Sequence, residues 1–293
     1  MVFLTFLGMF TNQYVPIWMK DNENKHMTQV IGELSSLKSS LDMQILASNA
    51  MVASAPIYSP IQLHAEGVPV FASPTMGQLS LSGAKTSGGT SASLNYTFTS
   101  GSVTGWLDGT RGARTGGSIE FYGPNRYFVQ QIVTYENGAI ILSQADGEVV
   151  LAGIAMKITP SGTSNKVLIT FTSLTGDDKT IGGFGTKSIT TSVDYSSYTK
   201  VNNSIEKTNA LSISIVSKYG VAWSNYFKTA LNNTNSATSL WNAPPSDRDW
   251  WVNTTSSVVS GVTYYTISIV LQKVVSLEFT KAITSVALAE IGV

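Results

Sequence analysis

The chain has 293 residues, which is enough for two average domains or for a helix followed by one large β domain. Its 18 basic and 18 acidic residues cancel, and only 12% of residues are charged, so the sequence offers no basic patch for nucleic acid. Cysteine is absent, which favours an extracellular protein whose large body is held by its core rather than by disulfides.

The chain opens with an apolar and aromatic run over residues 1–19, and Lys20 is its first charged residue. A secretory signal would place basic residues ahead of such a run, so we expect either a processed form or a start inside the apolar segment. A membrane anchor or signal anchor is one interpretation, because crossing a bilayer core takes roughly 20 apolar residues. Pro16 cannot donate to the carbonyl of Asn12, and we predict a kink or a melted turn between these residues.

A heptad seam follows the apolar run. Its side chains are spaced by three and four residues, at Met27, Val30, Leu34, Leu37 and Leu41. We predict one helix over residues 1–46, and its residues 3–46 would span roughly 65 Å at 1.5 Å per residue. Such a helix is longer than one β domain, so the seam is expected to pack on the body while the N-terminal half projects. The side chains predicted to contact other subunits are Phe3, Leu4, Leu7, Phe10, Pro16 and Trp18.

From Ser59 onward the hydrophobic period changes to two, as in the stretch Leu211–Val216. The pair Asn137-Gly138 between apolar segments predicts a two-residue β-hairpin. Many short strands between turn residues favour an antiparallel β-sandwich or barrel. The predicted fold class is therefore α+β, with an N-terminal helix over residues 1–50 and a β-rich globular domain over residues 59–293.

One helix is predicted inside the body, over Tyr219–Leu231, with Val221, Tyr226 and Ala230 on a shared face. The region after it is rich in aromatic residues. If exposed, these rings could stack on sugars, as in an adhesin; if buried, they belong to the core or to an interface. They are Trp241, Trp250, Trp251, Tyr264 and Tyr265.

The sequence offers little material for catalysis. Its two histidines, His26 and His64, accompany no nucleophile elbow and no zinc-binding spacing, so we expect no catalytic residue, no metal site and no cofactor. Four Asn-X-Ser/Thr sequons lie in the β-rich part and are candidate N-glycosylation sites. They begin at Asn95, Asn202, Asn232 and Asn253.

Several segments carry a resemblance to a known family. The apolar helix continuing into Val15–Leu41 (VPIWMKDNENKHMTQVIGELSSLKSSL) resembles the N-terminal region of archaeal type IV pilin-like surface proteins. Residues 67–74 (GVPVFASP), 135–141 (YENGAII) and 286–291 (VALAEI) are similar to segments of large members. The resemblance covers roughly residues 5–85 and 116–190. The chain departs from the family pattern because no basic residue and glycine cleavage site precede the helix.

The resemblance implies a pilin that is made as a membrane-inserted precursor, trimmed by a prepilin peptidase and polymerised by pilus assembly machinery. The helices would form the core of an extracellular, cell-surface filament used for attachment, and the β domains would form its glycosylated exterior. A pilus is favoured over an archaellum because the body is large. The main alternative is a monomeric membrane-anchored adhesin or glycan-binding protein, and a secreted hydrolase with carboxylates brought together by the fold is a further one.

Overall fold

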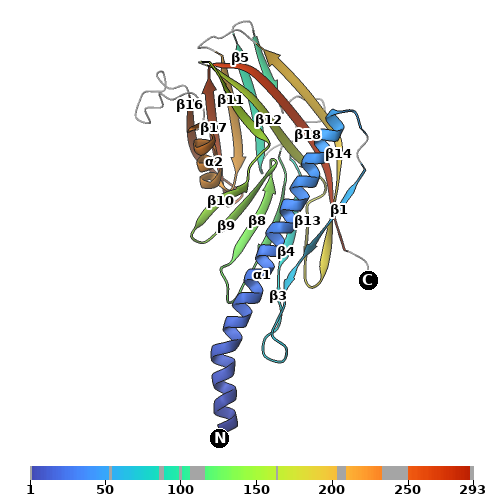
Figure 1. Ribbon diagram of the computed structural model, residues 1–293, viewed down its shortest axis with the longest axis vertical. Coiled ribbons are helices and arrows are strands. Elements are labelled where there is room, and N and C mark those ends of the chain that lie inside the picture. Colours follow the sequence, from blue (N-terminus) through green and yellow to red (C-terminus); the bar gives the residue numbers. More distant parts are fainter. Residues whose placement is uncertain are drawn as a thin grey trace.

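The computed structural model describes residues 2–52, 55–85, 89–98, 101–105, 116–162, 164–202, 209–232 and 250–290. Helix α1 (Val2–Asn49) is continuous over 48 residues, which confirms the predicted N-terminal helix. At 1.5 Å per residue it is about 72 Å long. Figure 1 shows α1 lying along the β body, with its first turns extending beyond it.

The melted turn predicted near Pro16 is wrong, because every residue from 12 to 16 is helical. Proline removes one backbone hydrogen bond from a helix interior. The helix continues through it because Val15 and Met19, which flank the proline, both pack against Val68 of the β body.

The β body contains three large sheets, which we number in order. The first sheet has the order β1 (Ile57–Gln62), β14 (Thr186–Asn202), β18 (Val274–Glu290), β12 (Ser164–Thr175), β11 (Met156–Ser161). The second has the order β10 (Gly147–Ala152), β9 (Ala139–Gln144), β8 (Gln131–Glu136), β7 (Ser118–Gly123), β4 (Gln78–Ser82), β13 (Lys179–Gly182). The third has the order β16 (Trp250–Val259), β17 (Val262–Gln272), β15 (Ala210–Ser217), β5 (Ser91–Phe98), β6 (Gly101–Gly105).

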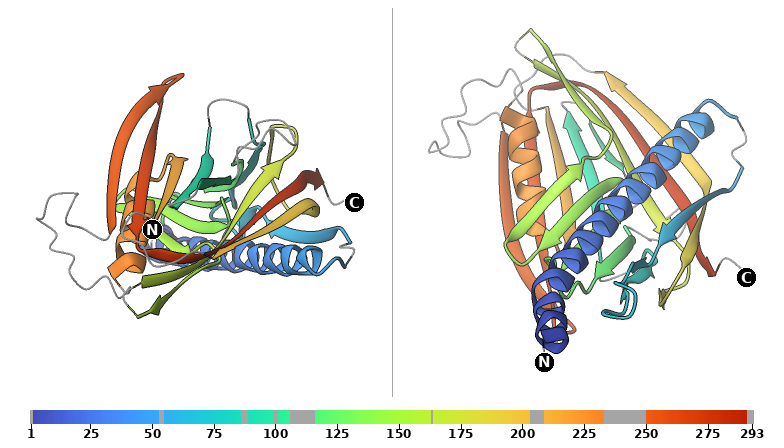
Figure 2. Two further views of the ribbon diagram at one scale, coloured as in Figure 1. Left: turned by 90° about the horizontal axis from the view of Figure 1, so that it is seen from above. Right: turned by 60° about the horizontal axis from the view of Figure 1, so that its bottom comes forward.

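Neighbouring strands pair antiparallel throughout the described parts of these sheets, except for β12 and β18, which run parallel. A short pair, β2 (His64–Ala65) and β3 (Thr75–Met76), supports a loop that reaches toward α1. The sheets curve around their shared interior and include a half-barrel, as Figure 2 shows. The predicted α+β class with a mainly antiparallel β domain is therefore confirmed.

Two large hydrophobic clusters form the core. The first joins the third sheet and helix α2 (Gly220–Asn232) to strands β9, β12 and β18. The second joins α1 to the first and second sheets. Strands that alternate apolar and polar residues, such as β15, bury their apolar face in one of these clusters.

Helix α2 lies where it was predicted, but its predicted face is wrong. Val221 is exposed, whereas the buried face carries Ala222, Trp223, Phe227 and Leu231. Trp223 and Phe227 stack with their ring centroids 5.9 Å apart. The larger apolar surface of these two aromatic rings decides which side of the helix faces the core.

The hairpin between β8 and β9 confirms the prediction made from Asn137-Gly138. Both residues have positive φ angles, 52° for Asn137 and 91° for Gly138. That pair of conformations defines a type I′ turn, whose twist matches the twist of the strands that it joins. Strands β8 and β9 pair from Gln131 to Glu136 in regular register.

Candidate assembly surface

The heptad seam of α1 lies against the β body. The five side chains predicted for it, from Met27 to Leu41, are essentially inaccessible and belong to the second core cluster. The body contributes to the same cluster Ile61 of β1, Phe121 of β7 and Ile189 of β14. Burying an aliphatic side chain contributes about 1.5–3 kcal/mol, so five of them hold this half of the helix firmly.

A buried carboxylate, Glu23, fixes the position at which α1 crosses the second sheet. Its oxygens accept hydrogen bonds from three successive backbone N–H groups, those of Arg126 (3.0 Å), Tyr127 (2.8 Å) and Phe128 (2.7 Å). The hydroxyl of Thr75 donates a fourth bond at 2.7 Å. Successive N–H groups form a concave nest that binds an anion, which compensates the burial of this charge. Glu23 thereby ties α1 to both the β7–β8 loop and β3.

Two further side chains of α1 hold the backbone of β1. His26 Nε2 lies 2.9 Å from the carbonyl oxygen of Gln62, and Glu33 Oε2 accepts the Gln62 N–H at 2.9 Å. Burial lowers the pKa of His26 below its ordinary value of 6.5, although the hydrogen bond to Gln62 and the Glu33 carboxylate oppose the shift. His64 Nδ1 accepts the N–H of Gly185 at 3.0 Å. Both histidines therefore act as structural connectors between elements.

Toward its N-terminus α1 exposes apolar side chains. Met9, Tyr14, Ile17 and Trp18 are exposed, Ile17 to 63% of its surface. Of the residues predicted to contact other subunits, Leu7, Phe10 and Pro16 are half-buried and Trp18 is exposed. The side chains of Phe3 and Leu4 lie outside the described part of the structure.

Contact with the β body extends farther along α1 than the sequence indicated. Phe10, which was assigned wholly to contacts with other subunits, packs on Phe71 of the same chain, with ring centroids 5.3 Å apart. Contact between the helix and the body therefore continues past Lys20 as far as Phe10. The reason is the β2–β3 loop, which reaches beyond the sheets to touch the helix.

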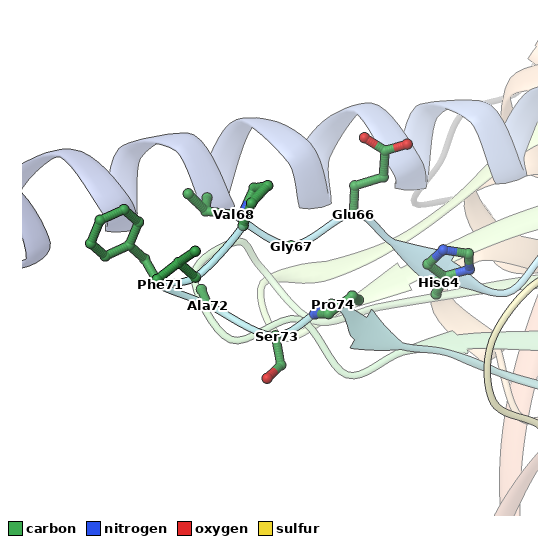
Figure 3. Close-up of a pocket in the computed structure, with 10 residues that line it drawn as sticks. His64, Glu66, Gly67, Val68, Phe71, Ala72, Ser73 and Pro74 are labelled. Atoms are coloured by element: carbon green, nitrogen blue, oxygen red, sulfur yellow. The ribbon is translucent and has the colours of Figure 1, made fainter.

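The β2–β3 loop carries an unusual tip. Figure 3 shows residues 64–74 beside α1, with Val68 toward the helix and Ser73 away from it, around an open cavity of about 580 Å³. Gly67 is required, because a Cβ there would collide with backbone atoms of Ala72 and Pro74. Val70 is 100% exposed and has a φ angle of 71°. That conformation is rare for a β-branched residue and costs about 1–2 kcal/mol.

The C-terminal end of α1 also carries an exposed apolar residue with a positive φ angle. The helix closes with a Schellman motif, in which Val52 N–H donates to Ala47 O and Met51 N–H to Ser48 O, both at 3.0 Å. The left-handed position of this motif usually holds glycine, but here it holds Met51, with a φ angle of 58° and 97% exposure. Met43, Leu46 and Val52 are exposed beside it.

A second buried acid, Glu136, lies between β8 and α2. Glu136 Oε1 accepts hydrogen bonds from the Ser217 hydroxyl and from Trp223 Nε1, the latter at 2.6 Å, while Oε2 has no partner among the described residues. Burial raises the pKa of Glu136 to about 7 against the opposing effect of these two bonds. Both Glu136 and Ser217 are fully buried, so this network is inaccessible to a substrate and acts within the core.

The four sequon asparagines, Asn95, Asn202, Asn232 and Asn253, are all exposed. Asn95 on β5 and Asn253 on β16 lie on the outer side of the third sheet, while Asn202 ends β14 and Asn232 ends α2. Among the C-terminal aromatic residues, Trp250 is buried in the first core cluster, and Trp251, Tyr264 and Tyr265 are half-buried. Trp241 lies outside the described residues.

No group of His, Asp and Glu side chains within the described ranges is arranged to hold a metal ion. None of the helices in the described part of the chain combines the length and apolar character needed to span a bilayer. Comparison with protein-family models, curated proteins and solved structures finds no match to this chain.

The sequence did not reveal the roles of Glu23 and the β2–β3 loop, nor the left-handed backbone at Val70 and Met51. The nest that binds Glu23 lies more than 100 residues away along the chain, so no local sequence pattern predicts this contact. A charged residue four positions before Met27 would have been a usable signal, since it lies on the same face as the apolar seam. Val70 and Met51 carry no sequence signal, because left-handed positions are normally recognised by glycine or asparagine.

Proposed function

We propose that the chain is a structural subunit of an extracellular helical filament similar to a type IV pilus. The observation that carries this proposal is the N-terminal part of α1, which leaves the β body while still exposing large apolar side chains, among them Met9, Ile17 and Trp18. A soluble monomer rarely exposes a contiguous patch of this kind, and larger ones mark interaction sites. Packing this part of the helix among copies of itself removes it from water.

The docked half of α1 supports the same function mechanically. The seam from Met27 to Leu41 and the Glu23 nest fix the helix to the body as one rigid unit. A load applied to the β body is then transmitted to the helix, and through it to neighbouring subunits. If burial of the projecting part covers roughly 1,000 Å² of apolar surface, at about 25 cal/mol/Å² it contributes about 25 kcal/mol before the entropic costs of association.

The resemblance described above supplies the remaining parts of the proposal. The subunit would be held in the membrane as a precursor, processed by a prepilin peptidase and assembled with the β bodies outside. The exposed sequons, such as Asn95 and Asn253, would carry glycans on the filament exterior. The filament would serve attachment, without enzymatic activity. The rival function, a monomeric adhesin, keeps the same helix in lipid and forms no polymer.

Assembly of the full-length chain tests the proposal. The purified protein is expected to form filaments visible by negative-stain electron microscopy when detergent is removed. Replacing Met9 and Ile17 together by glutamate should abolish them while leaving the melting temperature unchanged, because both side chains are exposed. The matched control replaces Val149 and Val258, exposed apolar residues of the body, by glutamate and should keep the filaments. A wild-type chain that stays monomeric without detergent but inserts into vesicles would favour the anchored adhesin.

A further inference from the structure

Two apolar patches lie at opposite ends of α1. The first, which we call the aromatic tip, is formed by Phe10, Tyr14, Trp18, Val70 and Phe71. The second, which we call the methionine end, is formed by Met43, Leu46, Met51 and Val52. We propose that the aromatic tip of one copy docks on the methionine end of the next copy. This inference rests on the proposed filament function and specifies the contact that builds the polymer.

The two patches are chemically matched. In the aromatic tip, the Phe10 ring lies 5.3 to 5.7 Å from the rings of Tyr14, Trp18 and Phe71, measured between centroids, so the four rings form one cluster. The methionine end offers two flexible thioether side chains and two aliphatic ones. Methionine adapts its shape to irregular surfaces, and its sulfur makes favourable contacts with aromatic rings. A cluster of rings and a methionine-rich patch are therefore complementary surfaces.

Both patches also keep an apolar side chain where the backbone favours glycine. Val70 and Met51 have positive φ angles and are the two most exposed large apolar residues among those described, at 100% and 97%. In a monomer these side chains contact water and strain the backbone, so nothing in the isolated fold explains them. A strained residue that persists is a pointer to function. Contact with another copy at both ends gives each side chain a role.

Geometry requires that the partner be a second molecule. Tyr14 and Leu46 are separated by 32 helical residues, which is about 48 Å at 1.5 Å per residue. One rigid helix cannot bring its two ends together, whereas a parallel copy displaced by about 48 Å along the axis can. Because the two patches are unlike, the contact is heterologous, and a heterologous contact that does not close generates an open helical polymer.

Charges along the intervening helix do not oppose this arrangement. Asp21 pairs with Lys25, and Lys38 pairs with Asp42, with nitrogen–oxygen distances of 2.6 Å in both pairs. Each pair is neutral as a unit, so parallel helices in adjacent copies present little repulsion to one another at these positions. The specificity of the contact then resides in its two apolar ends.

Replacement by glycine separates this proposal from simple loss of stability. Met51→Gly and Val70→Gly relieve the positive φ angles, so the melting temperature should stay equal or rise, while the critical concentration for filament formation should increase at least tenfold. The control is Ser260→Gly, which relieves a φ angle of 51° at the exposed β16–β17 turn. It should raise the melting temperature without affecting assembly. Unchanged critical concentrations for both Met51→Gly and Val70→Gly would overturn the inference.

Cross-linking gives the second measurement, because the natural chain contains no cysteine. Full-length chains carrying Trp18→Cys and Met43→Cys are mixed, assembled and oxidised. The expected product is a disulfide-linked dimer that contains one chain of each kind. A Trp18→Cys chain that links efficiently to itself would show a symmetric contact and contradict the proposal. If the wild-type chain forms no filaments, the proposed function fails; if filaments form and only these cross-links and glycine variants disagree, this inference alone fails.

Discussion

The two halves of α1 share one continuous helix but are stabilised by different physics. From Glu23 to Ile45 the helix buries a residue at nearly every turn and satisfies a buried carboxylate with backbone N–H groups. From Leu7 to Trp18 it touches the body through a small cluster around Val68 and Phe71 and exposes large apolar side chains. Continuity of secondary structure therefore says little about where a helix gains its stability.

This difference separates the molecule into a part that folds and a part that assembles. Helical stability in proteins comes mainly from tertiary packing of an amphipathic face, which only the docked half possesses within one chain. The projecting half instead exposes large apolar side chains, among them Met9, Ile17 and Trp18. Changes in the docked half should therefore alter the free energy of unfolding, and changes in the projecting half should alter association.

The largest effect is expected at Glu23. Replacing the buried Glu23 by alanine leaves three backbone N–H groups and the Thr75 hydroxyl without their acceptor and should reduce the free energy of unfolding by about 3–5 kcal/mol. The matched control is Asp21→Ala, two residues earlier on the same helix, where the carboxylate is exposed and paired with Lys25. Its effect should stay within about 0.5 kcal/mol.

Urea unfolding followed by circular dichroism measures both variants. Equal losses of stability for Glu23→Ala and Asp21→Ala would show that the nest does not hold the helix. Hydrogen exchange adds a local test, since amide protons of residues 126–128 should exchange faster only in the Glu23 variant. Such a result would distinguish release of the nest from a general loss of helix stability.

A smaller effect, confined to the β body, is expected from Glu136. Its pKa is raised from 4.5 to about 7 in the folded protein, so the folded state keeps a proton that the unfolded state loses over this interval. Stability should therefore be greatest below about pH 4.5 and fall by about 3 kcal/mol as the pH rises to 7. In Glu136→Gln this fall should disappear, which thermal or urea unfolding at several pH values can measure.

Subtracting the two pH profiles isolates the Glu136 contribution from that of His26, whose lowered pKa acts in the opposite direction. Glu66→Gln, at an exposed position, is the control and should leave the profile unchanged. Parallel profiles for the wild type and Glu136→Gln would contradict the assignment. Since Glu136 is fully buried and belongs to neither the aromatic tip nor the methionine end, Glu136→Gln should not change the pH dependence of filament formation.

Much of the fold could be predicted from local patterns. The heptad spacing located the seam, the change of period located the β body, and Asn137-Gly138 located a hairpin, because each depends on residues close together in sequence. Features that depend on distant residues could not be predicted. The parallel pairing of β12 with β18 joins segments more than 100 residues apart, and the face of α2 was decided by which sheet received Trp223.

The same distinction applies to the candidate assembly surface. Apolar residues near the start of the helix were visible in the sequence, whereas the contribution of Val70 and Phe71 depended on a loop folding back beside Phe10. The effect of Pro16 was also misjudged, since proline rules describe an isolated helix and take no account of the packing of Val15 and Met19. The packing of Val15 and Met19 on Val68 therefore outweighs the tendency of Pro16 to interrupt the helix.

The smallest effect on stability is expected at Pro16 itself, and it provides the most direct comparison of the two halves. Pro16→Ala restores a backbone hydrogen bond to Asn12, which in an ordinary helix interior gains up to about 3 kcal/mol. Here the gain should change the free energy of unfolding by less than about 0.5 kcal/mol, because the projecting half contributes little to global folding. The matched variant Ser36→Pro introduces proline at an exposed position of the docked half and should cost about 3 kcal/mol or more. Thermal unfolding followed by circular dichroism compares the two. A large stabilisation by Pro16→Ala would mean that the projecting half folds cooperatively with the body, and the division between a folding half and an assembling half would then be wrong.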